Sequence, residues 1–261
     1  MTDRFLPGVP GEEIERIFHA APGNEIVSGK FDSPESSAAL AANAFGFFLK
    51  RGQYFPRLPR CEWVDWTGLS LSLEQEVQFP WRGGRHPILD VLVITRSAFI
   101  GIESKRFEPF RGKTSTPFSE AYWRPVWGSR MKGYKRLRDQ LREDGQLYAC
   151  LDAVQLVKHA FALRTAVNSI PEYTSLTPTL FYVYAEPEFW PKSGKPVKEK
   201  DKIMHRAEIE RFANEVARDE VQFIACPYTD VLRSWKGSKD SRIREHAEAV
   251  IERFAVRPSH V

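Results

Sequence analysis

The chain has few cysteines and no long apolar segment. Only three of its 261 residues are cysteines, and they are far apart, with no Cys-x-x-Cys pair: Cys61, Cys150 and Cys226. This spacing argues against a zinc knuckle or a disulfide framework and favours a reducing compartment. The longest uncharged apolar stretch, at 38–49, is too short to span a bilayer, and the N-terminus has no signal-peptide pattern. We therefore expect a cytoplasmic protein with no membrane partner.

The motifs of several hydrolase classes are also absent. No His-Glu-x-x-His or Gly-x-Ser-x-Gly occurs, so zinc proteases and serine hydrolases have no support. There is no internal repeat. Hydrophobic residues make up 42% of the chain and charged residues 28%, which is ordinary for a globular protein and argues against wholesale disorder. At this length we expect one elaborated domain.

The net charge of +4 is modest, but basic residues are concentrated in one segment. Between residues 106 and 142, ten Lys or Arg stand against three Asp or Glu. The same segment holds seven aromatic residues: Phe107, Phe110, Phe118, Tyr122, Trp123, Trp127 and Tyr134. Basic residues interleaved with aromatics suit phosphate contact combined with base stacking. A solvated helix face would produce the same run of charge, so both interpretations stay open.

Hydrophobic periodicity predicts an α/β order of elements. We expect helices at 11–20, 36–50, from about 131, at 151–167, 204–217 and 241–254, and strands at 71–79, 87–95, 98–105, 179–186 and 221–228. This order predicts a mixed central sheet flanked by helices. We expect a core at 33–190 with a basic and aromatic insertion at 106–142, followed by a C-terminal α/β extension at 200–261.

Three charged residues interrupt the apolar hairpin PILDVLVITRSAFIGIESKRF: Asp90, Glu103 and Lys105. Because side chains alternate between the faces of a strand, Glu103 and Lys105 share one face. A reversal symmetric about Arg96 and Ser97 places Asp90 directly opposite Glu103, with Cβ atoms roughly 4.5 to 5.5 Å apart. An odd-length turn without a bulge would instead put the two carboxylates on opposite faces.

Two carboxylates this close repel each other unless a cation lies between them. A hard divalent ion such as Mg²⁺, for which Mn²⁺ could substitute, suits oxygen ligands and keeps waters in its remaining positions. Lys105 is one step further along the same face. It could orient or deprotonate a water, or neutralise charge that develops on a phosphate. The three residues therefore suit hydrolysis of a phosphodiester.

Asp90 followed by Glu103-Ser104-Lys105 resembles the active site of the PD-(D/E)xK nuclease superfamily. The order of elements over residues 33–190 is similar to its restriction-endonuclease-like core, and HPILDVLV and IESKRFEPF resemble a bacterial branch of such proteins. The resemblance implies Asp90 and Glu103 as metal ligands, Lys105 as the catalytic lysine and the Ser104 carbonyl as a further ligand. The chain departs from the pattern at Leu89, where the motif has proline.

Further site residues are expected around this centre. Of the two glutamates at 74 and 76, we prefer Glu76 as an additional metal ligand. Gln155 and His159 lie one helical turn apart, a spacing similar to the Gln-x-x-x-Tyr helix of exonuclease branches, which implies a catalytic role for Gln155. The cations expected to contact nucleic acid are Arg106, Arg111, Lys113, Arg130, Lys132, Lys135 and Lys158.

The sequence thus predicts a metal-dependent nuclease with DNA as the expected substrate. Cleavage of RNA stays open, as do endonucleolytic and exonucleolytic modes. A homodimer would suit duplex cleavage, although no sequence signature marks one. The alternative is a catalytically inactive nucleic-acid-binding or assembly protein on the same fold, because fold alone does not fix function.

Overall fold

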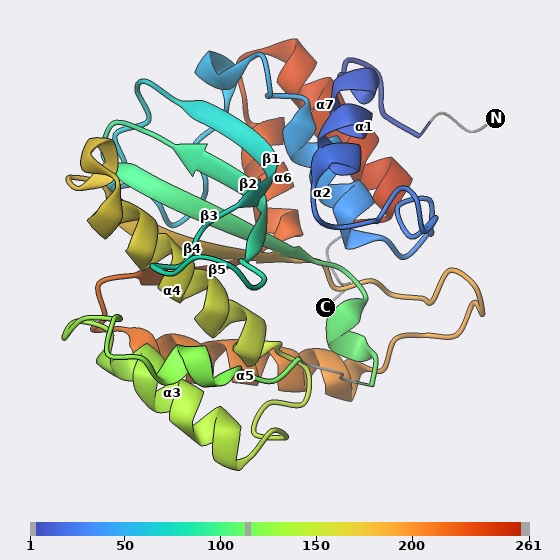
Figure 1. Ribbon diagram of the computed structural model, residues 1–261. Coiled ribbons are helices and arrows are strands. Elements are labelled where there is room, and N and C mark those ends of the chain that lie inside the picture. Colours follow the sequence, from blue (N-terminus) through green and yellow to red (C-terminus); the bar gives the residue numbers. More distant parts are fainter. Residues whose placement is uncertain (1–3, 113–115, 257–261) are drawn as a thin grey trace.

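A computed structural model describes residues 4–112 and 116–256 of the chain (Figure 1). Its α-helices are α1 (Gly11–Ala20), α2 (Ser37–Gly46), α3 (Lys132–Glu143), α4 (Ala153–Ser169), α5 (Glu199–Val216), α6 (Tyr228–Lys236) and α7 (Ser241–Phe254). Its strands are β1 (Ser70–Glu76), β2 (Ile88–Ile94), β3 (Ala98–Lys105), β4 (Thr177–Tyr184) and β5 (Gln222–Pro227). Within these described ranges, no helix is both long and apolar enough to cross a membrane.

The five strands form one mixed sheet in the order β1-β2-β3-β4-β5. Strand β2 is antiparallel to both β1 and β3, whereas β4 runs parallel to both β3 and β5. The predicted α/β class with a mixed sheet is therefore confirmed. The parallel arrangement places the carboxyl ends of β3, β4 and β5 at one end of the sheet, where β1 ends and β2 begins.

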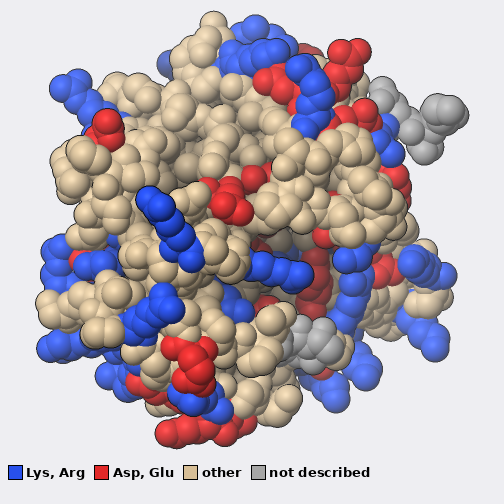
Figure 2. All heavy atoms as spheres, in the orientation of Figure 1, with Lys and Arg blue, Asp and Glu red and all other residues tan. Residues whose placement is uncertain are grey.

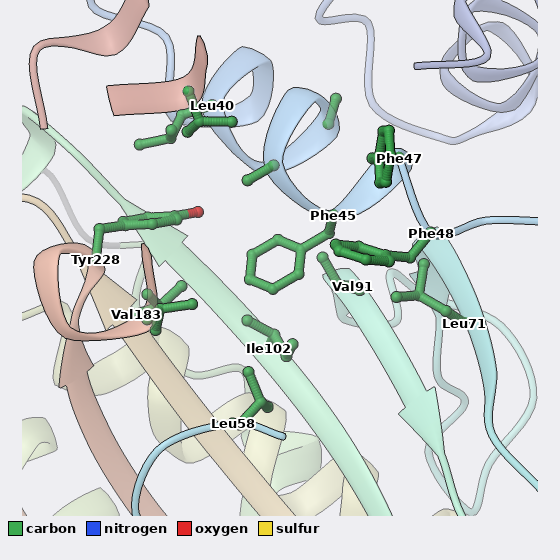
Figure 3. Packing of buried hydrophobic residues seen from close by; sticks show 14 of the residues in the cluster. Leu40, Phe45, Phe47, Phe48, Leu58, Leu71, Val91, Ile102, Val183 and Tyr228 are labelled. Atoms are coloured by element: carbon green, nitrogen blue, oxygen red, sulfur yellow. The ribbon is translucent and has the colours of Figure 1, made fainter. Parts of the chain in front are cut away.

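Helices cover both faces of this sheet. On one face, α2, α6 and α7 pack against Val91, Ile102 and Val183 of the strands, and Figure 3 shows Phe45 and Tyr228 meeting in this core. On the other face, α3, α4 and α5 enclose a second core that includes Phe161 and Tyr182. Figure 1 shows these two helical layers on opposite sides of the strands. The sheet is thus buried on both faces, which explains its nearly continuous apolar runs.

Local sequence signals set the ends of the two helices nearest the hairpin. Ser36 caps α2, its Oγ accepting a hydrogen bond of 3.0 Å from the N–H of Ala39. Asp152 caps α4 in the same way, with 3.1 Å between its Oδ1 and the N of Gln155. Each side chain satisfies a backbone donor that the first turn of a helix leaves unpaired. Gln155 therefore lies in the first turn of α4.

The part expected as a C-terminal extension completes the sheet and one core. Strand β5 pairs with β4, and α6, which the sequence analysis did not predict, begins directly after β5 at Tyr228. The Tyr228 hydroxyl lies 2.7 Å from Oγ of Ser104, and both side chains are buried. The last third of the chain therefore packs directly behind the charged end of β3.

Candidate metal and nuclease site

The hairpin has the register that the sequence predicts. Strands β2 and β3 pair Val91 with Ile102 and Ile94 with Phe99. These pairs are symmetric about Arg96 and Ser97, as the predicted reversal requires. The ladder ends one step before Asp90 and Glu103. There the Asp90 carboxylate accepts a hydrogen bond from the N–H of Ser104, with 2.6 Å between Oδ2 and N. Asp90 thus bridges to β3 through its side chain.

The side chains of β1 and β2 change from one face of the sheet to the other at Glu74 and Asp90. Leu73 and Val91 pack into the core on the α2 side, whereas Val77 and Leu89 pack on the α4 side. In a regular strand, residues two or four apart share a face, so the pleat reverses between them. The pairing on either side keeps one register, and Glu74 has a left-handed backbone with φ of 48°.

This reversal places Leu89 on the same face as Gly101 of the neighbouring strand. A Cβ atom at residue 101 would lie 2.8 Å from Leu89 Cδ1 and 2.9 Å from Leu163 Cδ2 of α4. Glycine at 101 therefore provides the space that the displaced Leu89 occupies. Leu92 and Ile94, which follow the reversal along β2, pack on the α4 side as well.

Glu103 is the most deeply buried acid of the site. Its side chain is 1% exposed, and its two oxygens face Lys105 Nζ and His159 Nδ1, the latter at 3.2 Å. Neither oxygen accepts a hydrogen bond of good geometry from the described residues. Burial alone would raise the pKa of Glu103, but Lys105 and then His159 lower that pKa to about 2. Glu103 is consequently ionised at neutral pH.

Asp90 and Glu74 show the opposite shift. Burial and the nearby Glu103 charge raise the pKa of Asp90 well above its ordinary value, against the opposing effect of Lys105. Burial, followed by Glu103 and Glu25, raises the pKa of Glu74 to about 7. Three carboxylates from three neighbouring strands thus influence one another, and Lys105 interacts with two of them, Asp90 and Glu103. Burial, together with repulsion from the Glu103 charge, favours the protonated forms of Asp90 and Glu74.

The donor atoms fit a hard cation held by two carboxylates. The described residues contain no group of three or more His, Cys, Asp or Glu arranged to hold a metal ion. The ligands available are therefore Glu103, whose two buried oxygens lack a hydrogen bond of good geometry, and the half-buried Asp90, whose Oδ2 accepts from the Ser104 N–H. Because the carbonyl of Lys105 bonds to Ala185 beyond β4, the backbone groups of Ser104 point to the opposite side, toward Asp90.

Beside the carboxylates lies a cavity of about 240 Å³ at the end of β3. Lys105, Arg111, Gln155 and Tyr182 are among the residues that line it. Burial by itself would lower the pKa of Lys105, but Glu103, Glu108 and Asp90 together raise it, so the ammonium stays charged. Lys105 therefore connects the acid pair to a space that a substrate group could enter, and Gln155 lies at the same space.

Glu76, the preferred additional ligand, lies elsewhere. It is paired with Ile88 and lines a separate groove of about 460 Å³ with Ser72 and Phe79. Glu74 instead is the glutamate whose pKa responds to Glu103. We correct the preference accordingly. Alternation along a regular strand puts both glutamates on one face, so only the reversal at Glu74 separates them.

The predicted nucleic-acid contacts need further correction. Arg106 is buried, and its guanidinium donates to the carbonyls of Pro34 at 2.6 Å and Phe254 at 2.5 Å. Its charge is used inside the fold, so an exposed phosphate contact at Arg106 is excluded. Lys113 lies outside the described residues.

The other five cations lie nearer the surface, and four of them already have protein partners. Arg111 forms an ion pair with Glu35, and Arg130 with Glu220. Lys135 donates to the carbonyl of Gly128 at 3.0 Å, and Lys158 donates to that of Thr116 at 2.8 Å. Lys132 is exposed. The two ion pairs offset the charges of Arg111 and Arg130, whereas the carbonyl contacts hold Lys135 and Lys158 in place and leave them charged.

The aromatic residues of the same segment mostly belong to the core. Phe107, Tyr122, Trp127 and Tyr134 are buried, and Trp127 stacks on Phe161 of α4 with 4.2 Å between ring centroids. These four rings have no free face for a nucleobase, which corrects the stacking interpretation for them.

Comparison of the chain with family models, with curated proteins and with solved structures gave no match. The PD-(D/E)xK resemblance accordingly stays a prediction that rests on the residues of this chain.

Proposed function

We propose that the protein is a metal-dependent nuclease that hydrolyses phosphodiester bonds of DNA. The observation that carries this proposal is the grouping of Asp90, Glu103 and Lys105 at one end of the sheet, beside a cavity. Desolvated carboxylates in a site with too little positive charge are costly to maintain for structure alone. An inactive protein on the same fold would gain nothing from that cost.

Asp90 and Glu103 would hold the ion, which we propose to be Mg²⁺ with Mn²⁺ as a substitute, and the Ser104 carbonyl faces the same side. When bound, such an ion lowers the pKa of a coordinated water and polarises a phosphoryl oxygen. In the protein itself, the Ser104 N–H orients the Asp90 carboxylate through one of its oxygens. His159 faces the other side of Glu103, which leaves the Lys105 side of that carboxylate toward the cavity.

Lys105 would act as a charged donor to the phosphate. Because neighbouring acids raise its pKa, the ammonium keeps its proton at neutral pH and cannot accept one from water. A fixed cation aimed at the place where phosphate oxygens gain charge stabilises the transition state. Of the roles that the sequence leaves open to Lys105, the structure therefore favours neutralisation of phosphate charge. Gln155 lines the same cavity and would position the scissile group by hydrogen bonds.

The test is cleavage of linear duplex, circular duplex and single-stranded DNA, and of RNA, in Mg²⁺, Mn²⁺ or chelator. We expect cleavage of DNA with metal and none with chelator. Asp90→Asn, Glu103→Gln and Lys105→Met should each lose at least about 100-fold in rate. Glu210→Gln, which changes an exposed acid on α5, is the matched control and should cleave normally.

A second measurement reports metal binding without catalysis. Mg²⁺ at 100 times its dissociation constant should stabilise the wild type by about 2.7 kcal/mol, because it binds the folded state only. Asp90→Asn should lose this increase. Absence of cleavage together with retained DNA binding would instead favour the inactive nucleic-acid-binding protein.

A further inference from the structure

The loop between β1 and β2, residues 77–87, carries two arginines that have no hydrogen-bond or ion-pair partner among the described residues. Arg82 and Arg85 are exposed, and among residues 4–112 and 116–256 neither has a hydrogen bond or an ion pair. The basic segment at 106–142 differs in this respect, because most of its described cations contact acids or carbonyls. In the view of Figure 2, Lys and Arg side chains lie across the middle of the molecule, beside a hollow in which atoms of Asp or Glu are visible further back.

The base of this loop is held in place by specific contacts. Val77 N–H donates to the carbonyl of Pro87 at 2.9 Å, and Phe79 N–H donates to Nδ1 of His86 at 3.0 Å. These bonds extend the β1–β2 hairpin beyond the regular strands. The two arginines are thereby presented from a fixed base.

Aromatic rings anchor the loop to the α4 layer. Trp81 stacks on Phe79 with 4.8 Å between ring centroids and meets Trp127 edge-on at 5.4 Å. Arg124 lies over the Trp81 ring, with 5.0 Å between its guanidinium carbon and the ring centroid. Trp81, the residue directly before Arg82, is therefore held in place, and Figure 1 shows the loop passing across the middle of α4.

The tip of the loop points into open space. Gly83 and Gly84 both have left-handed backbones, with φ of 78° and 81°, and no atom lies within 4 Å of a Cβ built on either residue. Two successive positive φ angles are cheap only for glycine, and they set the turn between the two arginines. The turn therefore projects Arg82 and Arg85 outward from the anchored base.

The loop also lies at the correct end of the sheet. It leaves β1 after Glu76 and enters β2 at Ile88, two residues before Asp90. Lys105 ends β3 at this same end, since β2 and β3 are antiparallel. At a rise of about 3.4 Å per residue, Pro87, the last residue of the loop and three residues before Asp90, lies roughly 10 Å from Asp90 along β2. An arginine side chain of the loop can consequently contact the sugar-phosphate backbone of a nucleic acid whose scissile phosphate lies at Lys105.

We propose that Arg82 and Arg85 form a phosphate clamp that grips the backbone of duplex DNA beside the acid pair. Guanidinium groups bind phosphate oxygens through paired hydrogen bonds, and an unpaired guanidinium loses no protein contact when it does so. The clamp rests on the proposed function for its choice of ligand. The phosphate contacts that it predicts lie on the β1–β2 loop, outside the basic segment at 106–142.

The test measures DNA binding without cleavage. In an Asp90→Asn background with chelator, the affinity for a duplex of about 20 base pairs is measured over a series of salt concentrations. Arg82→Ala/Arg85→Ala should weaken binding and reduce the slope of log affinity against log salt by about 2, because two phosphate contacts are lost. The urea midpoint should not change, since both side chains are exposed and neither forms a hydrogen bond or ion pair within the described residues.

The control removes the same charge elsewhere. Arg218→Ala/Lys239→Ala changes two exposed cations, of which Arg218 precedes β5 at the opposite end of the sheet. It should leave the slope almost unchanged. An unaltered slope in the loop variant, an equal fall in the control, or no DNA binding by the wild type would each overturn the clamp. If the slope falls as expected but the wild type never cleaves, the clamp stands and the proposed nuclease activity fails.

Discussion

Replacing Glu74 by glutamine should stabilise the protein at alkaline pH and leave it nearly unchanged in acid. Burial, Glu103 and Glu25 raise the pKa of Glu74 from 4.5 to about 7, so the folded protein holds this proton more tightly than the unfolded chain. The stability that results is complete below pH 4.5, declines as the pH rises, and is lost above pH 7. Glutamine is nearly isosteric and has no charge to bury.

The size of the effect follows from the shift. One pKa unit corresponds to about 1.36 kcal/mol, so a change from 4.5 to about 7 gives about 3.4 kcal/mol at most. Relaxation of the site around an ionised Glu74 reduces this figure. We expect Glu74→Gln to gain about 2 kcal/mol in free energy of unfolding at pH 8 and less than about 0.5 kcal/mol at pH 4.5.

The assay is urea unfolding of both proteins at pH 4.5 and pH 8 with a chelator present, so that no divalent ion offsets the repulsion. Glu76→Gln, on the same strand but facing a different groove, is the control and should change little at either pH. A Glu74→Gln protein that is less stable at pH 8, or that gains equally at both values, would refute the assignment of Glu74 to the acid cluster.

Three further substitutions test the packing and charge around the site. Lys105→Met leaves the buried Glu103 without its cation and should cost about 3 kcal/mol, measured by urea unfolding at pH 7, with no loss if Glu103 were well solvated. Gly101→Val forces Leu89 aside and should lower the free energy of unfolding by about 2 kcal/mol, whereas an unchanged value would contradict the close approach. Arg106→Ala removes hydrogen bonds to two carbonyls and should cost about 2 kcal/mol in unfolding, yet leave the salt dependence of DNA binding unchanged, which filter binding would measure.

The hairpin was predictable because its information is local. A two-residue reversal at Arg96 and Ser97 fixes the pairing, and the apolar alternation of Leu92, Ile94 and Phe99 fixes the face. The Thr95 hydroxyl then accepts from the N–H of Ala98 at 3.0 Å, which closes the turn. The pairing puts Asp90 and Glu103 at the same end of the hairpin, opposite the turn. Their proximity could therefore be predicted without the rest of the fold.

The role of Glu74 was not predictable in this way. Its selection over Glu76 depends on the reversal of the pleat at a left-handed residue, and glutamate gives no local signal for φ of 48°. Such a conformation costs about 1 to 2 kcal/mol for a residue with a Cβ. It persists because Leu73 and Val77 are each held in a different core. Strain of this kind results from packing on both faces of the sheet, which only the complete fold specifies.

The number of cations in a segment is likewise a poor guide to its role, because the sequence does not show which cations have partners in the fold. Counting Lys and Arg over residues 106–142 predicts a phosphate-binding surface, but a count does not register that Arg130 and Arg136 each pair with an acid of a distant segment. The binding strength of a basic surface depends on the charge left unpaired, since an ion pair must be broken before a phosphate can replace it. Arg82 and Arg85 add only two charges to the composition. Because the glycine turn presents them in the open and neither has an ion pair among the described residues, we expect those two charges to contribute more to DNA binding than a longer run of paired ones.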